Sequence, residues 1–195
     1  MACGRFAASP EGDIFIESPR GHFKESRQDL GAPLSIPGSL CVGSTPMSVE
    51  FGQTSLAVRE QVLVDRLLPL RDPQARFAWA IDQARLRPAL PAALRQEHFR
   101  VQGCLVRLWL VPEFREGRCW FQTDSDAVTL RAFSGMLCDL ASGALPEELI
   151  VWNPEFLERL GLLRQLADNR RATVGRVAEL IRGFAAVHQP GNDAR

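Results

Sequence analysis

The stretch from residue 101 to residue 127 constrains the fold of this chain more than any other. Residues 105–111 are rich in aliphatic and aromatic side chains and contain no glycine or proline, which is the pattern of a β-strand. Residues 119–123 form a second run of the same kind. Pro112 and Gly117 lie between the two runs and bracket a turn. The stretch is therefore predicted to form a β-hairpin.

Ser125 follows the second strand and is suited to cap the next helix, because its hydroxyl can accept a backbone hydrogen bond. Along the first strand, successive side chains point to opposite faces of the sheet. One face carries Val106, Leu108 and Leu110, and the other carries Leu105, Arg107, Trp109 and Val111.

Cys104 stands just before the first strand and directly after Gly103. A glycine adopts backbone angles that other residues cannot, so the thiol can sit on a tight loop. A reactive cysteine needs such a place, because its thiolate must be reachable. The alternative is a structural cysteine, since free cysteines are among the most buried residues. His98 is the nearest histidine in the sequence, and we interpret it as a surface loop residue.

Composition and charge exclude several classes of function. A chain of 195 residues suits one domain with a tail, and its 23 basic and 23 acidic residues balance. A general nucleic-acid-binding protein would show a basic excess. No apolar run approaches the roughly 20 residues that span a bilayer. We therefore expect neither nucleic acid nor a membrane as a partner.

The five cysteines, at positions 3, 41, 104, 119 and 138, show no CxxC spacing, and the histidines are scattered. An odd number of cysteines in a chain of this size argues against a disulfide framework and favours a reducing, cytoplasmic location. The spacing of cysteines and histidines fits no zinc site, so no metal is expected. Cys119 falls in a strand and Cys138 on a helix, and both are expected to be core thiols.

Residues 1–58 differ from the rest of the chain, because glycine, proline and serine recur and no periodicity persists. We predict a mostly disordered extension that lacks the apolar segment of a signal peptide. It is also too acidic for an organelle transit peptide. Alternatively, Met47 is the true start of the protein. Residues 189–195 form a polar tail.

Helical periodicity begins after Ser55 and recurs on both sides of the hairpin. The expected fold is α+β, with about three antiparallel strands covered by helices on one face. Leu149–Trp152 is the candidate third strand, if that segment is not helical. The predicted helices are two short ones before Cys104 (the second capped by Asp72-Pro73), one over residues 127–142, two short turns near residues 146 and 155, and a last one over residues 169–187.

Arg170 and Arg171 fall in the first turn of the last predicted helix, where the helix dipole is positive. A like charge at this position costs up to about 1 kcal/mol unless an anion lies nearby. One interpretation is a solvated surface charge. The other is that one of these arginines serves an anion elsewhere in the fold, such as Asp126, a thiolate or a persulfide.

The sequence Gln102-Gly103-Cys104, the strand with Trp109, and the second strand running into Ser125-Asp126-Ala127 resemble the SufE family of sulfur acceptors, which includes the related CsdE proteins. The resemblance runs from about residue 60 to about residue 187. It implies a SufE-like domain over residues 59–188 with the SufE/IscU-type fold, in which a small antiparallel sheet packs against several helices.

The resemblance implies that Cys104 accepts a persulfide sulfur from a SufS-type, pyridoxal-phosphate cysteine desulfurase, stimulates that enzyme and passes sulfur to iron–sulfur scaffold proteins. Asp126 and Arg170 would support the cysteine loop or the partner surface. The protein would bind no cofactor, and it would be an accessory protein with one reactive cysteine and not itself an enzyme.

The chain departs from the family pattern at two places. Leu105 and Val106 follow the cysteine, where family members usually carry polar residues. Asn169 and Thr173 replace a serine and a glycine around Arg170. Two other functions stay open: an iron–sulfur scaffold of the related IscU fold, which needs three or four clustered ligands, and a non-catalytic adaptor of a desulfurase.

Overall fold

The computed structural model describes residues 6–8, 14–16 and 54–189. Most of the predicted extension over residues 1–58 lies outside the described residues, as does the end of the polar tail. Within the extension, β1 (Phe6–Ala8) and β2 (Ile14–Ile16) pair as antiparallel strands.

The predicted hairpin is confirmed. β3 (Leu108–Arg115) and β4 (Arg118–Ser125) pair as antiparallel strands along their whole length. The turn between them consists of Glu116 and Gly117, whose φ angles are 53° and 71°. Two consecutive residues with positive φ make a type I′ turn, and its twist matches that of the flanking strands.

The prediction that Pro112 begins the turn is wrong, because Pro112 lies inside β3, opposite Phe121. A proline lacks the N–H that a central strand donates to its neighbours. Among the described residues, β3 makes a single bridge on its outer side, between Trp109 and Arg100. Pro112 therefore stands in an edge strand, where a missing donor is tolerated. The first strand is therefore longer than predicted at its C-terminal end.

The predicted third strand is also wrong, because its first two residues belong to α4 (Pro146–Ile150). Proline is favoured in the first turn of a helix. The Glu148 carboxylate then accepts hydrogen bonds from the backbone N–H groups of Leu145 (3.1 Å) and Leu56 (3.0 Å), which favours a helix start. The outer edge of β4 makes one bridge instead, between Cys119 and Ala144.

The helices agree with the predicted pattern. The Asp72 carboxylate caps the second one by accepting a 2.9 Å hydrogen bond from the Gln74 N–H. The helices are α1 (Leu56–Leu67), α2 (Pro73–Leu86), α3 (Val128–Ala141), α4, α5 (Phe156–Arg159) and α6 (Asp168–Val187), with 3₁₀ turns η2 (Ala92–Leu94), η3 (Glu97–Phe99) and η4 (Leu163–Gln165).

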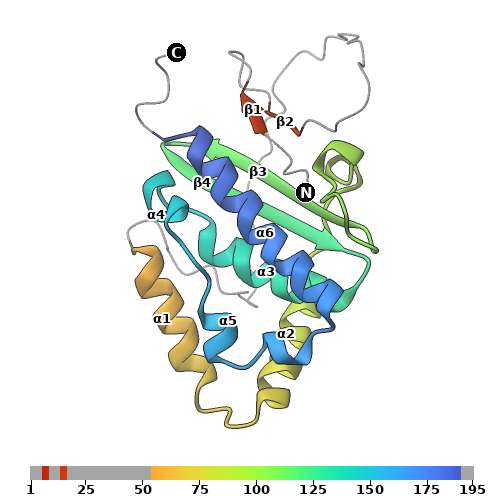
Figure 1. The fold of residues 1–195 in the computed structure, drawn as a ribbon, viewed down its shortest axis with the longest axis vertical. Helices are drawn as coiled ribbons and strands as arrows, with labels where there is room; N and C mark the ends of the chain where they lie inside the picture. Colours follow the sequence, from red (N-terminus) through yellow and green to blue (C-terminus); the bar gives the residue numbers. More distant parts are fainter. Residues whose placement is uncertain (1–5, 9–13, 17–53, 190–195) are drawn as a thin grey trace, which may run out of the picture.

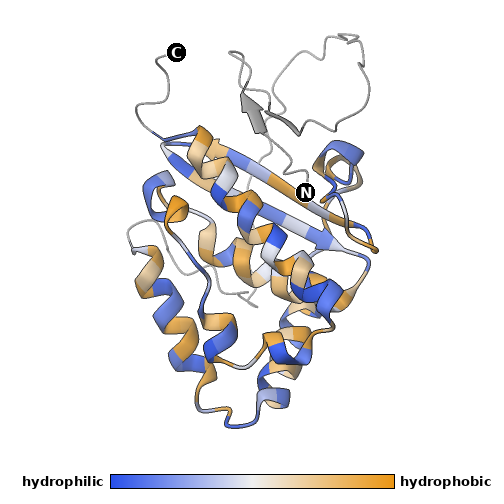
Figure 2. Cartoon of the chain, in the orientation of Figure 1, coloured by the Kyte–Doolittle hydropathy of each residue, from blue (hydrophilic) through white to orange (hydrophobic). Residues whose placement is uncertain are grey.

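The central element is α3, which packs against β4, α1, α2 and α6 (Figure 1). Most of its residues are buried, whereas α1 and α6 show hydrophobic and hydrophilic residues in alternation, as helices with one buried face do (Figure 2). The α+β fold, a small antiparallel sheet packed against several helices, is thereby confirmed. No helix in the described part of the chain is both long and apolar enough to cross a bilayer.

Both faces of the hairpin are covered. Leu108 and Leu110 point into the main core, as predicted from the alternation. On the opposite face Trp109 and Val111 form a second cluster with Leu90, which precedes η2. Residues 87–101, here called the covering segment, therefore lie over this face and lead directly to the loop that carries Cys104.

The turn offers a test of the hairpin geometry. Glu116→Asn should raise the free energy of unfolding by about 0.5–1 kcal/mol, because asparagine tolerates positive φ better than glutamate. Gly117→Ala should lower it by about 1 kcal/mol. A Cβ at Gly117 would meet no atom within 4 Å, so this loss would come from the backbone alone. Urea unfolding of both variants measures the two changes, and equal signs would contradict the assigned turn.

Candidate functional site: a cysteine loop at the open end of the hairpin

Residues 102–107, here called the cysteine loop, connect the covering segment to β3. The loop is closed at its base, where the Val101 N–H donates a 2.8 Å hydrogen bond to the Leu108 carbonyl oxygen. Because Leu108 pairs with Ser125, the loop lies at the open end of the hairpin, away from its turn. The loop also faces α6, whose Arg176 contacts it.

Cys104 is half-buried in this loop and packs, together with Val106, against the main core. Leu105 between them is 85% exposed. The loop therefore turns its thiol partly inward and displays a leucine to solvent. The thiol is reachable without being fully exposed, which suits a reactive cysteine better than a structural one.

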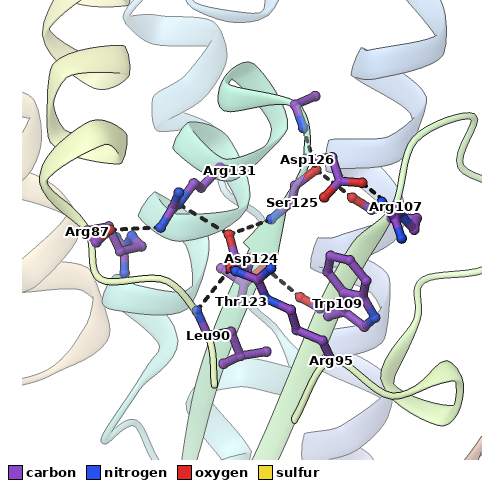
Figure 3. Close-up of polar contacts among 11 residues, drawn as sticks. Arg87, Leu90, Arg95, Arg107, Trp109, Thr123, Asp124, Ser125, Asp126 and Arg131 are labelled. Atoms are coloured by element: carbon purple, nitrogen blue, oxygen red, sulfur yellow. Dashed lines mark hydrogen bonds and ion pairs between the residues drawn. The ribbon is translucent and has the colours of Figure 1, made fainter. Parts of the chain in front are cut away.

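The C-terminal end of the cysteine loop is held by the end of β4. The Arg107 carbonyl oxygen accepts hydrogen bonds from Ser125 Oγ (2.7 Å) and from the Asp126 N–H (3.2 Å). The Arg107 Nε in turn donates to Asp126 Oδ2 at 2.7 Å (Figure 3). The predicted site residue Asp126 thus lies beside the loop, and its ion-pair partner is Arg107.

Ser125 has a different role from the one predicted. The N-cap of α3 is Ala127, so Ser125 is not the capping residue. Its hydroxyl is committed to the Arg107 carbonyl and accepts a 3.2 Å hydrogen bond from the Ala127 N–H. Ser125 therefore joins the cysteine loop to the residue that begins α3.

The N-terminal end of the loop is held by Arg176 of α6, whose Nη1 donates a hydrogen bond to the Gln102 carbonyl oxygen. The next residue, Gly103, has a φ of 77°, which favours glycine. A Cβ at this position would lie 2.0 Å from Arg176 Nη1. The backbone conformation favours glycine here, and the Arg176 guanidinium occupies the space that a side chain would need.

Asp124 is a buried carboxylate next to this site, with 2% of its surface exposed. Its Oδ2 accepts hydrogen bonds from Arg95 (2.6 Å) and from the Leu90 N–H (2.9 Å) (Figure 3). Arg131 of α3 forms an ion pair with its other oxygen at 3.2 Å. Buried charge is costly unless it is paired and hydrogen-bonded, so Asp124 binds β4, α3 and the covering segment into one unit.

The Trp109 ring is contacted by the arginine that pairs with Asp124 and by the arginine that pairs with Asp126. The guanidinium of Arg95, which pairs with Asp124, lies 5.6 Å from the Trp109 ring centroid, and that of Arg107 lies 5.8 Å from it. Both distances fall within the range of cation–π attraction. The covering segment and the cysteine loop therefore contact the same aromatic ring.

The other two described cysteines differ from Cys104. Cys119 and Cys138 are both buried, as predicted for core thiols. Burial raises the pKa of the Cys119 thiol to about 12, and it raises the pKa of Cys138 as well. Both stay protonated at neutral pH. Cys3 and Cys41 lie outside the described residues.

Arg170, the third predicted site residue, is exposed in the first turn of α6. Within residues 54–189 no hydrogen bond or ion pair involves its side chain. Its role in the site stays a prediction. His98 is exposed, as expected, and its ring contacts that of Phe99. No group of three His, Cys, Asp or Glu residues in the described ranges could hold a metal ion.

Sequence reasoning missed two residues of this site. Asp124 directly precedes Ser125 and Asp126 in the sequence. A charged residue at the end of a mainly apolar strand was the signal that could have identified it. Arg176 had no such signal, because it is one of several arginines on the last helix and its proximity to residue 102 is purely a matter of the fold.

This arrangement defines a small α+β domain that presents one half-buried cysteine on a fastened loop. The chain belongs to the SufE family: the family model, described as an Fe-S metabolism associated domain, matches residues 61–185. A solution structure of a hypothetical protein from Thermus thermophilus has the same fold, with a TM-score of 0.53 at 18% identity, covering 65% of this chain and 93% of that one.

Among curated relatives, the sulfur acceptor protein CsdE of Escherichia coli K12 is 29% identical over 133 residues, which are 67% of this chain and 88% of CsdE. The chloroplastic quinolinate synthase of Arabidopsis thaliana is 29% identical over 141 residues, 71% of this chain. The chain spans 19% of that protein, and 58% of an uncharacterized SufE-like protein of Synechocystis that is 26% identical over 92 residues.

Replacing the buried carboxylate tests whether Asp124 fastens the site. Asp124→Asn should lower the free energy of unfolding by about 3 kcal/mol, because it leaves two guanidinium groups without their anion. Asp126→Asn is the matched control and should cost about 0.5 kcal/mol or less, since the Arg107–Asp126 pair is largely exposed. Urea unfolding gives both values. Similar losses in the two variants would contradict the central position of Asp124.

Selective alkylation tests the assignment of the three described thiols. Iodoacetamide on the native protein at neutral pH should modify Cys104 well before Cys119 or Cys138, since the latter are buried and protonated. Trypsin separates them into peptides 101–107, 119–131 and 132–159, so mass spectrometry follows each one. Equal rates in native protein would contradict the assignment, and equal rates after unfolding provide the control.

Proposed function

We propose that this protein is a sulfur acceptor in iron–sulfur metabolism and that Cys104 carries the sulfur. The supporting observation is that, of the three described cysteines, Cys104 alone is partly exposed, and it stands on the loop at the open end of the hairpin. Membership of the SufE family and the likeness to CsdE, a sulfur acceptor protein by name, support the same role.

The chemistry is a persulfide exchange. A SufS-type cysteine desulfurase, which uses pyridoxal phosphate to take sulfur from free cysteine, would carry a persulfide on its own cysteine. The Cys104 thiolate attacks the outer sulfur of that persulfide, a new S–S bond forms, and the old S–S bond breaks. The desulfurase cysteine leaves as a thiolate, so no external oxidant or reductant is consumed.

The residues around Cys104 suit this exchange. Asp126 fixes the Arg107 end of the cysteine loop through the ion pair at 2.7 Å. The exposed Leu105 beside the thiol gives a desulfurase an apolar contact at the point of transfer. Arg170 offers an exposed cation for an acidic group of the partner. The protein then delivers its sulfur to an iron–sulfur scaffold, acting as a stoichiometric accessory protein.

A desulfurase assay tests this proposal. Wild-type protein should increase the rate of alanine formation from cysteine by a SufS-type desulfurase, because transfer to Cys104 clears the desulfurase persulfide for the next turnover. Cys104→Ser should abolish the increase. Cys138→Ala is the control: its thiol is buried, so the variant should still stimulate the desulfurase, provided that it is folded.

The outcomes also separate the alternatives. Full stimulation by Cys104→Ser would overturn the carrier role and favour a non-catalytic adaptor. A coloured protein that binds iron and sulfide through Cys104 without accepting persulfide would favour an iron–sulfur scaffold. Loss of stimulation together with intact binding of the desulfurase is the result that the proposal predicts.

A further inference from the structure

The two ends of the cysteine loop are fastened unequally. The Arg107 end is held by three hydrogen bonds to the end of β4: two to its carbonyl oxygen and one from its Nε to Asp126. At the Gln102 end, beyond the Val101–Leu108 hydrogen bond that closes the base of the loop, Arg176 holds the Gln102 carbonyl through a contact that is exposed to solvent. A force that moves the loop should therefore open the Gln102 end first.

Arg176 comes from a rigid support. The buried neighbours Thr173 and Val177 fix the rotation of α6 against the core, so the helix itself holds its position. What can move is the long arginine side chain, whose guanidinium occupies the space beside Gly103. The contact between α6 and the loop thus depends on a flexible side chain anchored on a fixed helix.

The position of the loop sets how much of the Cys104 thiol is exposed. Cys104 and Val106 pack against the main core while the loop is closed. Attack on a sulfur–sulfur bond requires that the thiolate reach the outer sulfur of a bulky partner, and access limits such exchanges. A half-buried thiol meets that requirement better when the Gln102 end swings away from α6.

We propose that Arg176 is a positioning residue for Cys104: by holding the Gln102 carbonyl, its guanidinium keeps the cysteine loop turned inward. Release of this contact lets residues 102–106 swing outward about the closed base of the loop, where Val101 is bonded to Leu108. The consequence for sulfur delivery rests on the proposed function, whereas the control of Cys104 exposure does not depend on it.

The direction in which the alkylation rate changes distinguishes two possible roles of Arg176. A guanidinium near a cysteine can also favour the reactive thiolate by its charge, and removing it would then slow alkylation. Removing a group that holds the loop closed should instead speed alkylation. The two roles of Arg176 therefore predict opposite changes in the rate of modification of Cys104.

The decisive variant is Arg176→Ala, whose Cys104 should react with iodoacetamide about two- to tenfold faster than in wild type, the range expected for losing one hydrogen bond. The rate is read from the tryptic peptide 101–107, so modification of other cysteines does not enter. Arg182→Ala is the matched control. Arg182 also lies on α6 and donates a 3.1 Å hydrogen bond to a backbone carbonyl, that of Trp152, and its removal should leave the rate unchanged.

Gly103→Ala provides a second approach to the same contact, because its Cβ would displace the guanidinium from Gln102. It should also speed alkylation, because it displaces the guanidinium and strains a backbone whose φ is 77°. A slower rate in Gly103→Ala would overturn the proposal, because both effects of this substitution loosen the Gln102 end of the loop. An unchanged or slower rate in Arg176→Ala would overturn it as well.

Parallel sulfur-transfer reactions separate this inference from the proposed function. If wild-type Cys104 gains no sulfur from a desulfurase, the carrier role fails, while the alkylation rates still decide the role of Arg176. If wild type gains sulfur and Arg176→Ala is alkylated no faster than wild type, the positioning role alone fails.

Discussion

The buried carboxylate of Asp124 is the constraint on which the site depends. It is compensated by a guanidinium from the covering segment, another from α3 and a backbone N–H of the covering segment. Loss of any of these partners would leave the buried carboxylate less fully compensated. The end of β4 is therefore fixed relative to α3 and to the covering segment. The neighbouring residues Ser125 and Asp126 become a firm support for the cysteine loop.

This support explains why the three described thiols differ in exposure. Cys119 and Cys138 lie inside the packed layers, where burial keeps them protonated. Cys104 lies at the open end of the hairpin, on a loop that is held firmly by the end of β4 and more weakly by α6. In the proposed role, the carrier thiol has to be protected between encounters and available during them, and a loop fastened firmly at one end and loosely at the other would provide both conditions.

Much of this could be predicted from the sequence. The hairpin, the helices and the α+β class follow from local periodicity, and the motif around Cys104 indicated the family. The errors have local causes: Pro112 does not break the strand, because an edge strand tolerates proline, and Leu149 does not begin a strand, because the proline and glutamates before it start a helix. Arg176 could not be predicted, because its contact with Gln102 joins residues 74 positions apart.

The central claim is that sulfur comes to rest on Cys104. The most direct measurement loads a desulfurase with isotopically labelled sulfur from cysteine, adds this protein without reductant for a single turnover, and maps the label by peptide mass spectrometry. The account predicts one labelled sulfur atom on the peptide 101–107, removable by reductant, and none on the peptides that contain Cys119 or Cys138. Label that stays on the desulfurase, or that reaches Cys119 or Cys138 in place of Cys104, would contradict it.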